Sequence, residues 1–350
     1  LFQPEVSKYE VAPWPERIFR GRYPKSAKPE DRKGIPPSYA IELQTVMNTL
    51  NDMKQKRVEW DCGTRGIGVL ISDSLMFQRG DPTPSDSHMS HFYGLAMPLL
   101  KHGIPVAPVQ LENVTVAHYL DGFKVLLLTY QGMKPLSAEV HAKLAEWVKE
   151  GGVLVVCDDD SDPFNAVREW WNSDGLSYKT PREHLFEQLK FKQSPAEQKQ
   201  TEWSFGKGDV IWLRENPVRL AQDPQDAERI VALVHQAADR AKMEWRETNY
   251  LLLRRGPYLI AAGLDESIPG AAKVLHGRFI NLFDSQLRVQ TEIRIEPGSR
   301  FFLRDLDATE ASSPEVLASA GKSLVVKRDA KSVSLAVEGV GETPGVVLMQ

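Results

Sequence analysis

One thiol and four carboxylates stand directly after a predicted buried strand. The apolar run Val153–Val156 is followed by Cys157, Asp158, Asp159, Asp160 and Asp162. In an open α/β sheet, ligands bind beyond the carboxyl ends of the strands. A thiol in that place could act as a nucleophile, and clustered carboxylate oxygens suit a hard cation such as Ca²⁺. The spacing therefore points to a catalytic site or a cation site.

The neighbours of Cys157 argue against a nucleophile. A strained nucleophile turn needs small residues on both sides, whereas Val156 and Asp158 flank this cysteine. Nearby carboxylates also raise a thiol pKa, which opposes formation of the reactive thiolate. No downstream His-x-Glu pair supplies a base. We expect a small buried residue here, with a stand-alone thiol hydrolase or amidotransferase as the alternative.

The acidic run allows a calcium site or an acidic turn. Asp158, Asp160 and Asp162 are the candidate ligands, although the Gly and the further ligands of an EF-hand loop are absent. In the alternative, these side chains cap the following helix and bind the loop backbone. A ligand pocket at this edge could also include residues near other strand or helix ends, namely Asp73, Gln78, Tyr130, Asp159 and His184. The adjacent Trp170 and Trp171 could stack on a sugar.

The elements that would position these residues alternate between strands and helices. Continuous apolar runs predict strands at 67–71, 104–109, 124–129, 153–157 and 209–213. Such runs are typical of a parallel sheet covered on both faces. Amphipathic stripes around Leu144 and Val234 predict two of the covering helices. We therefore expect a doubly wound, flavodoxin-like or class I amidotransferase-like α/β domain over residues 58–248.

The two ends of the chain follow other patterns. Short β-rich runs separated by turns recur from Tyr250 to Met349, which predicts an antiparallel β-sandwich over residues 249–350. Residues 1–57 are proline-rich, with a short strand at Tyr9–Ala12 and a helix whose apolar residues begin at Leu43.

Composition limits the partners. With 43 basic and 47 acidic residues the net charge is −4, so we expect neither nucleic acid nor a membrane surface as a partner. No apolar run is long enough to span a bilayer, which predicts a soluble protein. Two cysteines are compatible with a cytoplasmic or a periplasmic location. The start at Leu1, without a signal-peptide core, suggests a processed product or part of a longer protein.

Four runs resemble the amidotransferase-like middle domain of β-galactosidase-type glycoside hydrolases: Gly66–Arg79, Lys124–Thr129, Gly151–Val155 and Phe205–Trp212. In that family the domain is non-catalytic, commonly serves in oligomerisation, and precedes a small C-terminal β-sandwich. The runs 9–19 and 35–39 resemble the last strand, loop and helix of the family's TIM barrel. The resemblance thus implies a barrel-end remnant over residues 1–57.

The resemblance also implies where catalysis occurs. These hydrolases use two carboxylates on barrel strands, which would precede Leu1. Glu10 and Glu16 lie in barrel-like sequence, but neither matches either role. We therefore expect a non-catalytic C-terminal portion that shapes the active site, forms a homo-oligomer and meets carbohydrate through the parent enzyme. The alternatives are a thiol hydrolase using Cys157, or a cation- or sugar-binding module without turnover.

Overall fold

The structure is a computed structural model that describes residues 28, 34–55, 57–77, 89–192, 198–308, 315–329, 331–339 and 345–349. The chain forms two compact units. The β unit comprises residues 1–61, 250–265 and 269–350, and the α/β unit comprises residues 62–249 and 266–268. The predicted domain boundaries stay predictions, because compactness does not show which part folds alone. The barrel-like run 9–19, with Glu10 and Glu16, lies outside the described residues.

The α/β unit contains a six-stranded sheet in the order β3-β2-β4-β5-β7-β6. Its parallel strands are β2 (Ile67–Ile71), β3 (Ala107–Gln110), β4 (Val125–Leu128), β5 (Val153–Cys157) and β7 (Gly208–Leu213). This is the flavodoxin-like order, so the predicted parallel α/β fold is confirmed. The edge strand β6 (Gln200–Phe205) was not predicted and runs antiparallel to β7. The sheet is therefore mixed but mostly parallel.

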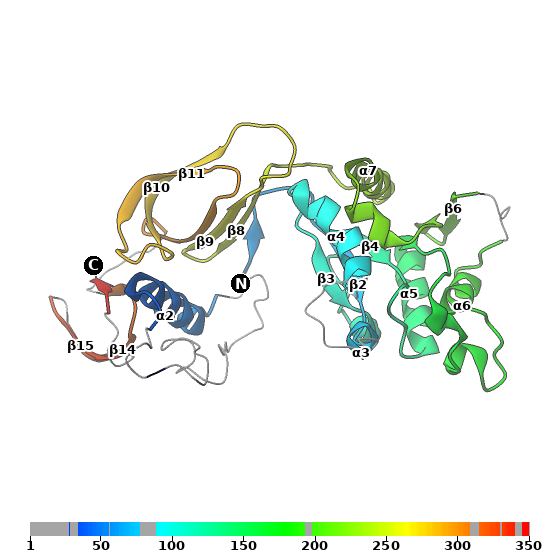
Figure 1. Ribbon diagram of the computed structural model, residues 1–350, viewed down its shortest axis with the longest axis horizontal. Helices are drawn as coiled ribbons and strands as arrows, with labels where there is room; N and C mark the ends of the chain where they lie inside the picture. The colour runs from blue at the N-terminus through cyan, green and yellow to red at the C-terminus, as the bar shows by residue number, and fades with distance from the viewer. Residues whose placement is uncertain are drawn as a thin grey trace. The chain divides into compact units, whose positions relative to one another are not determined.

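Helices cover both faces of this sheet (Figure 1). On one face, α4 (Ser90–Lys101) and α7 (Pro224–Arg240) pack on side chains such as Val69 and Val155. On the other face, α5 (Ala138–Glu150) and α6 (Pro181–Gln188) pack on Leu126 and Leu154. Because both faces are buried, every residue of β5 is buried. Burial of both faces explains why the strands appear as continuous apolar runs in the sequence.

The order of the strands creates a switch point in the α/β unit. The chain passes from β2 to β3 on one side, then returns across β2 to β4 on the other side. Ligands of open α/β sheets bind at such a point, beyond the carboxyl ends of the strands. Here that place is bordered by Ser72 and Asp73 after β2 and by the turn that follows β4. The short helix α3 (Ser74–Phe77) begins directly after it.

The β unit is built from antiparallel sheets, as the sequence predicts for this part of the chain. Its largest sheet has the order β1-β8-β9-β12-β10-β11. The strands are β1 (Glu59–Trp60), β8 (Tyr250–Arg255), β9 (Tyr258–Gly263), β12 (Arg300–Asp305), β10 (Lys273–Asn281) and β11 (Val289–Ile295). Two small sheets pair β13 (Val316–Ser319) with β16 (Val347–Met349), and β14 (Lys322–Arg328) with β15 (Val333–Glu338).

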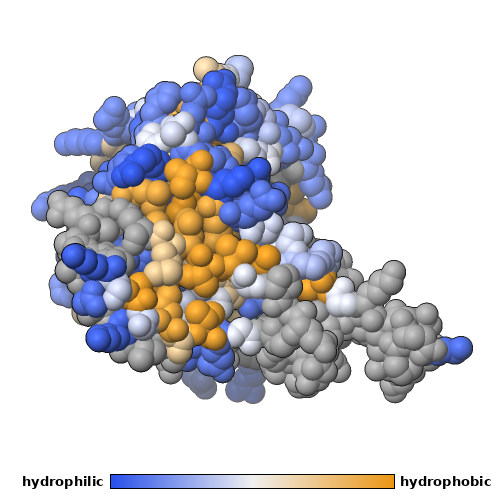
Figure 2. Space-filling view, turned by 90° about the vertical axis from the view of Figure 1, so that its left-hand side faces the viewer, coloured by the Kyte–Doolittle hydropathy of each residue, from blue (hydrophilic) through white to orange (hydrophobic). Residues whose placement is uncertain are grey.

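The predicted N-terminal helix belongs to the β unit. Helix α2 (Pro37–Asp52) begins after Pro36, and Val46 and Leu50 pack against a core that includes Phe302. The α2 stripe is therefore buried by sheets that are distant in sequence. Figure 2 shows apolar residues gathered on the face of the β unit that it presents. In the described part of the chain, no helix is long and apolar enough to cross a membrane.

One close backbone approach fixes α4 in the α/β unit. A Cβ atom on Gly94 would lie 1.8 Å from the carbonyl oxygen of Pro217, which begins the 3₁₀ helix η6 (Pro217–Ala221). We expect Gly94→Ala to lower the free energy of unfolding by roughly 3 kcal/mol, because the two backbones must separate. Met97→Ala, at an exposed position of the same helix, is the control, with an expected loss of about 0.5 kcal/mol. Equal urea midpoints for the two variants would contradict the close approach.

Candidate functional site

The acidic run after β5 connects the ends of three strands. Asp158 is 1% exposed, and its carboxylate accepts hydrogen bonds from the Tyr130 N–H (2.7 Å), the Gln131 side-chain amide (3.0 Å) and the Asp160 N–H (2.7 Å). The Trp212 indole of β7 donates to the Asp158 carbonyl at 3.0 Å. Asp158 therefore joins the carboxyl ends of β4, β5 and β7.

Burial disfavours the charged form of Asp158. Burial raises the pKa of this carboxyl from 3.8 to about 6, and the N–H donors from Asp160 and Tyr130 offset part of the effect. Both carboxylate oxygens are already used by protein donors. The side chain thus orders the backbone of the strand ends.

The other two candidate ligands are paired with cations. Lys134 donates to Asp162 at 2.6 Å, and both side chains are less than a tenth exposed. Burial by itself would raise the pKa of Asp162, but the bound Lys134 and the N–H groups of Phe164 and Gly132 lower it overall. Arg182 of α6 binds Asp160 through two nitrogens, with Nε 2.8 Å from Oδ1.

The carboxylates of the acidic cluster have hydrogen-bond and ion-pair partners within the protein. Asp162 caps the 3₁₀ helix η4 (Pro163–Ala166) by accepting from the Phe164 N–H at 2.9 Å. Within the described ranges, no group of three His, Cys, Asp or Glu side chains is placed to hold a metal ion. Asp158, Asp160 and Asp162 are each directed at different protein donors, and the calcium site stays a prediction. The alternative of a capping, loop-ordering acidic turn describes the observed contacts.

Cys157 lies on the other side of β5 from these contacts. Its side chain is fully buried in the core beneath α4 and α7. Burial raises the pKa of the Cys157 thiol far above its ordinary value, and the charges of Asp158 and Glu215 raise it further. A thiol in this state is neutral near pH 7 and closed to solvent. The position matches the expectation of a small buried residue.

Tyr130 and His184 meet through a residue that the sequence analysis missed. The Tyr130 hydroxyl lies 2.6 Å from His141 Nε2, and His141 Nδ1 lies 2.8 Å from His184 Nδ1. His141 is on the apolar stripe of α5, next to Val140, and is fully buried. A histidine within an apolar stripe was the available signal. We call Tyr130, His141 and His184 the imidazole chain.

Burial keeps the imidazole chain neutral. It lowers the pKa of His141 well below 6.5, with His184 as a further cause, and it also lowers the pKa of His184. Of the two facing Nδ1 atoms, one must donate and the other accept, so a second proton would break the contact. The rings of Trp170 and Tyr178 enclose His184 edge-on, at about 5.1 Å. Trp170 therefore serves in packing here, rather than as an open sugar platform.

The remaining predicted residues lie apart from the imidazole chain. Asp73 follows β2 and accepts from the Gln110 side chain at 2.9 Å. Asp159 accepts from Gln131 (2.8 Å) and from the Ser161 hydroxyl (2.6 Å). Gln78 lies outside the described residues. The structure thus divides the predicted site into a carboxylate network, a neutral imidazole chain and a separate group around Asp73.

Comparison with known proteins finds similar solved structures but no similar sequences. No model of a known protein family matches the sequence, and no curated protein matches it. A β-galactosidase from Bacillus circulans sp. alkalophilus is similar in structure, with 11% identity over 75% of this chain and 43% of that protein, and a TM-score of 0.43. A β-galactosidase from the Antarctic haloarchaeon Halorubrum lacusprofundi has 13% identity over 68% of this chain and 39% of that protein, with a TM-score of 0.41.

A GH42 β-galactosidase from G. stearothermophilus, solved as a catalytic mutant, has 12% identity over 69% of this chain and 40% of that protein, with a TM-score of 0.39. The chain therefore spans about two fifths of the length of these structures.

The raised pKa of Asp158 predicts a pH-dependent stability. The folded protein holds this proton more tightly than the unfolded chain, so the contribution is complete below pH 3.8 and is lost as the pH rises through about 6. We expect wild-type stability to fall by about 2 kcal/mol relative to Asp158→Asn between pH 4 and pH 7. Urea unfolding of both proteins measures this difference. Parallel pH profiles would show that Asp158 does not titrate in this range.

The imidazole chain predicts the opposite trend with pH. Because folding favours the neutral rings, their contribution is complete above pH 6.5 and is lost as the pH falls. We expect NMR spectra of histidine-labelled protein to show His141 and His184 titrating below 6.5, with assignment by His141→Gln and His184→Gln. A midpoint at or above 6.5 for either ring would contradict the buried neutral pair.

Proposed function

We propose that this chain is a non-catalytic portion of a β-galactosidase-type glycoside hydrolase, which supports the assembly of the enzyme and the shape of its active site. The observation that carries the proposal is the state of Cys157. At the strand end where an amidotransferase-like domain would hold its nucleophile, the thiol is fully buried, and its pKa is raised by that burial and by Asp158. The domain retains the fold while lacking a reactive group there.

The surrounding contacts support a structural use of the same edge. Asp158, Asp160 and Asp162 bind backbone N–H groups, Arg182 and Lys134. A general base must reach the proton that it abstracts, and these carboxylates are instead occupied by donors of the protein itself. We therefore assign these carboxylates the role of ordering the loops that follow β4 and β5.

The glycosidase part of the proposal is supported by the sequence. The runs 66–79, 124–129, 151–155 and 205–212 resemble the middle domain of these hydrolases, and antiparallel sheets follow the α/β unit as they do in that family. We place the acid/base and nucleophile carboxylates outside this chain, on barrel strands of the parent enzyme. Carbohydrate would then be bound through the parent enzyme, and the chain would take part in a homo-oligomer.

Hydrolysis of an aryl β-galactoside tests the proposal. We expect no turnover above the uncatalysed rate from this chain alone, and turnover from a product of the same gene that also contains the upstream coding region. Gel filtration of both measures assembly. Activity in the isolated chain, or no glycosidase activity in the longer product, would overturn the proposal.

Thiol labelling tests the alternative of a Cys157 hydrolase. We expect iodoacetamide at pH 8 to modify Cys157 on the order of a hundredfold more slowly in the native protein than in urea, because burial suppresses both thiolate formation and access. Peptide mass spectrometry separates Cys157 from Cys62, the second buried cysteine. Rapid labelling of Cys157 alone in the native protein would favour the thiol hydrolase.

A further inference from the structure

A pocket lies at the switch point of the α/β unit. It has a volume of about 360 Å³, within the range of small-molecule sites. Ser72 and Asp73 after β2, Glu112 of the 3₁₀ helix η3 (Leu111–Thr115) and Lys134 beyond β4 contribute its polar side. This is the place where the topology of an open α/β sheet directs a ligand. Asp158 is not among the residues that line this pocket.

The polar side of the pocket is fixed by its own hydrogen bonds. The Glu112 carboxylate accepts from the Ser72 hydroxyl (2.5 Å), the Asp73 N–H (3.1 Å) and the Gln110 amide (2.6 Å). Ser74 Oγ lies 2.8 Å from Ser72 Oγ and receives the Lys134 N–H at 2.7 Å. Gln110 also donates to the Asp73 carboxylate (2.9 Å), so the contacts of Glu112 position Asp73 before any ligand arrives, which lowers the entropic cost of binding.

The charge of the pocket is negative. Asp73, Glu112 and Glu169 line it, and Lys134 is the single cationic side chain among its described lining residues. The Lys134 ammonium is already bound by the Asp162 carboxylate (2.6 Å) and the Tyr130 carbonyl (2.5 Å). Its charge is therefore compensated within the protein, and the three carboxylates set the potential inside the pocket. Such a potential attracts cations and repels anions.

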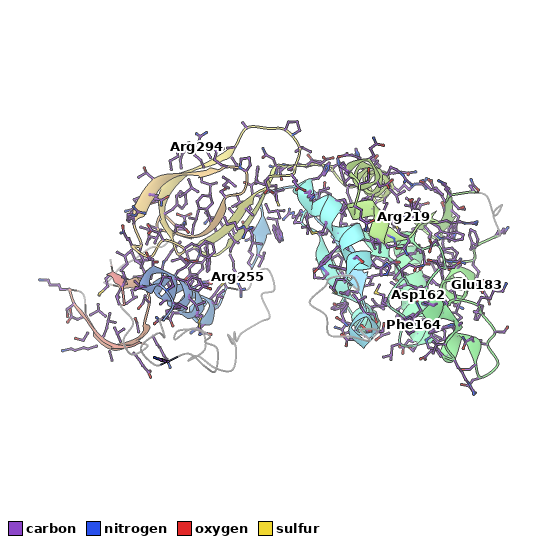
Figure 3. All side chains as sticks on the ribbon, in the orientation of Figure 1. Asp162, Phe164, Glu183, Arg219, Arg255 and Arg294 are labelled. Carbon is purple, nitrogen blue, oxygen red and sulfur yellow. The ribbon has the colours of Figure 1, made fainter. Side chains whose placement is uncertain are left out.

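The opposite side of the pocket is apolar and exposed. Leu136 is 73% exposed, Val167 is 46% exposed and Phe164 is 44% exposed, and the buried Trp171 lies behind them. Figure 3 shows Phe164 beside Asp162, at the end of the unit where α3 lies. Folding leaves these side chains in water although they border a cavity. An apolar body could remove them from water, and an aromatic face also attracts a nearby cation.

We propose that this pocket binds a small organic cation, with its ammonium group toward Asp73 and its apolar body against Leu136, Phe164 and Val167. Lys134 joins the pocket to the carboxylate network through its ion pair with Asp162. This binding proposal is independent of the proposed function, because it rests only on the residues that line the pocket.

Calorimetry of the whole chain with three matched probes tests the charge preference. The probes are 2-phenylethylammonium, neutral 2-phenylethanol and anionic phenylacetate, and methyl β-galactoside represents a neutral sugar. We expect the cation to bind at least about tenfold more tightly than the alcohol, with an affinity that falls as salt rises. Equal affinities for the cation and the alcohol, or binding of only the galactoside or phenylacetate, would overturn the assignment.

Two variants with matched controls place the ligand in the pocket. We expect Asp73→Asn to weaken binding of 2-phenylethylammonium roughly two- to fivefold, since one exposed charge is lost while the contact with Gln110 can remain. Leu136→Ser should weaken it about threefold. The controls Asp121→Asn and Val116→Ser remove comparable exposed side chains outside the pocket and should leave the affinity unchanged. Unchanged affinity in both pocket variants would show that the cation binds elsewhere.

Discussion

The arrangement of the α/β unit depends on one buried carboxylate. Asp158 accepts hydrogen bonds from Tyr130, Gln131 and Asp160, while its own N–H donates to the Leu213 carbonyl of β7. A buried charge without partners would cost several kcal/mol, so the loops after β4 and β5 must supply donors in fixed positions. Those fixed loops in turn place Lys134 against Asp162 and Arg182 against Asp160. The shape of the carboxyl edge follows from satisfying this side chain.

The same constraint explains why a cysteine at this strand end is inert. Successive residues of β5 point to opposite faces of the sheet, so Cys157 enters the core beneath α4 and α7 when Asp158 faces the loops. A thiolate there would be desolvated and next to a carboxylate, and both effects oppose its formation. A reactive cysteine would require the strand to end in a turn that exposes the thiol. The hydrogen bonds of Asp158 hold the backbone in another geometry.

The fold was predictable where burial alone determines it. The parallel strands appear as continuous apolar runs, since helices cover both faces, and α2 appears as a stripe around Val46 and Leu50. The antiparallel edge strand β6 was not predictable in this way, because its residues are only partly buried and carry no continuous run. The predicted strand at 104–109 became the later and shorter β3 (Ala107–Gln110). Its position follows from pairing with β2.

The candidate site was predictable in place but not in partners. Acidic residues after a strand can be read from the sequence, whereas Lys134 and Arg182, which bind Asp162 and Asp160, lie 28 and 22 residues away along the chain. Only the folded structure brings these charges together, so the sequence could not show that the candidate calcium ligands have partners within the protein. His141 was missed for a similar reason, since its partners Tyr130 and His184 come from a loop and another helix.

The Asp158 network and the pocket at the switch point differ in what they leave unsatisfied. Around Asp158, donors and acceptors are matched within the protein, so the network has little left to offer a ligand. At the switch point the polar framework is equally fixed, but Leu136, Phe164 and Val167 remain exposed beside it. Packing normally buries large apolar side chains that border a cavity, and single exposed ones carry little meaning. The three around this negatively charged cavity form the surface against which the proposed organic cation would pack.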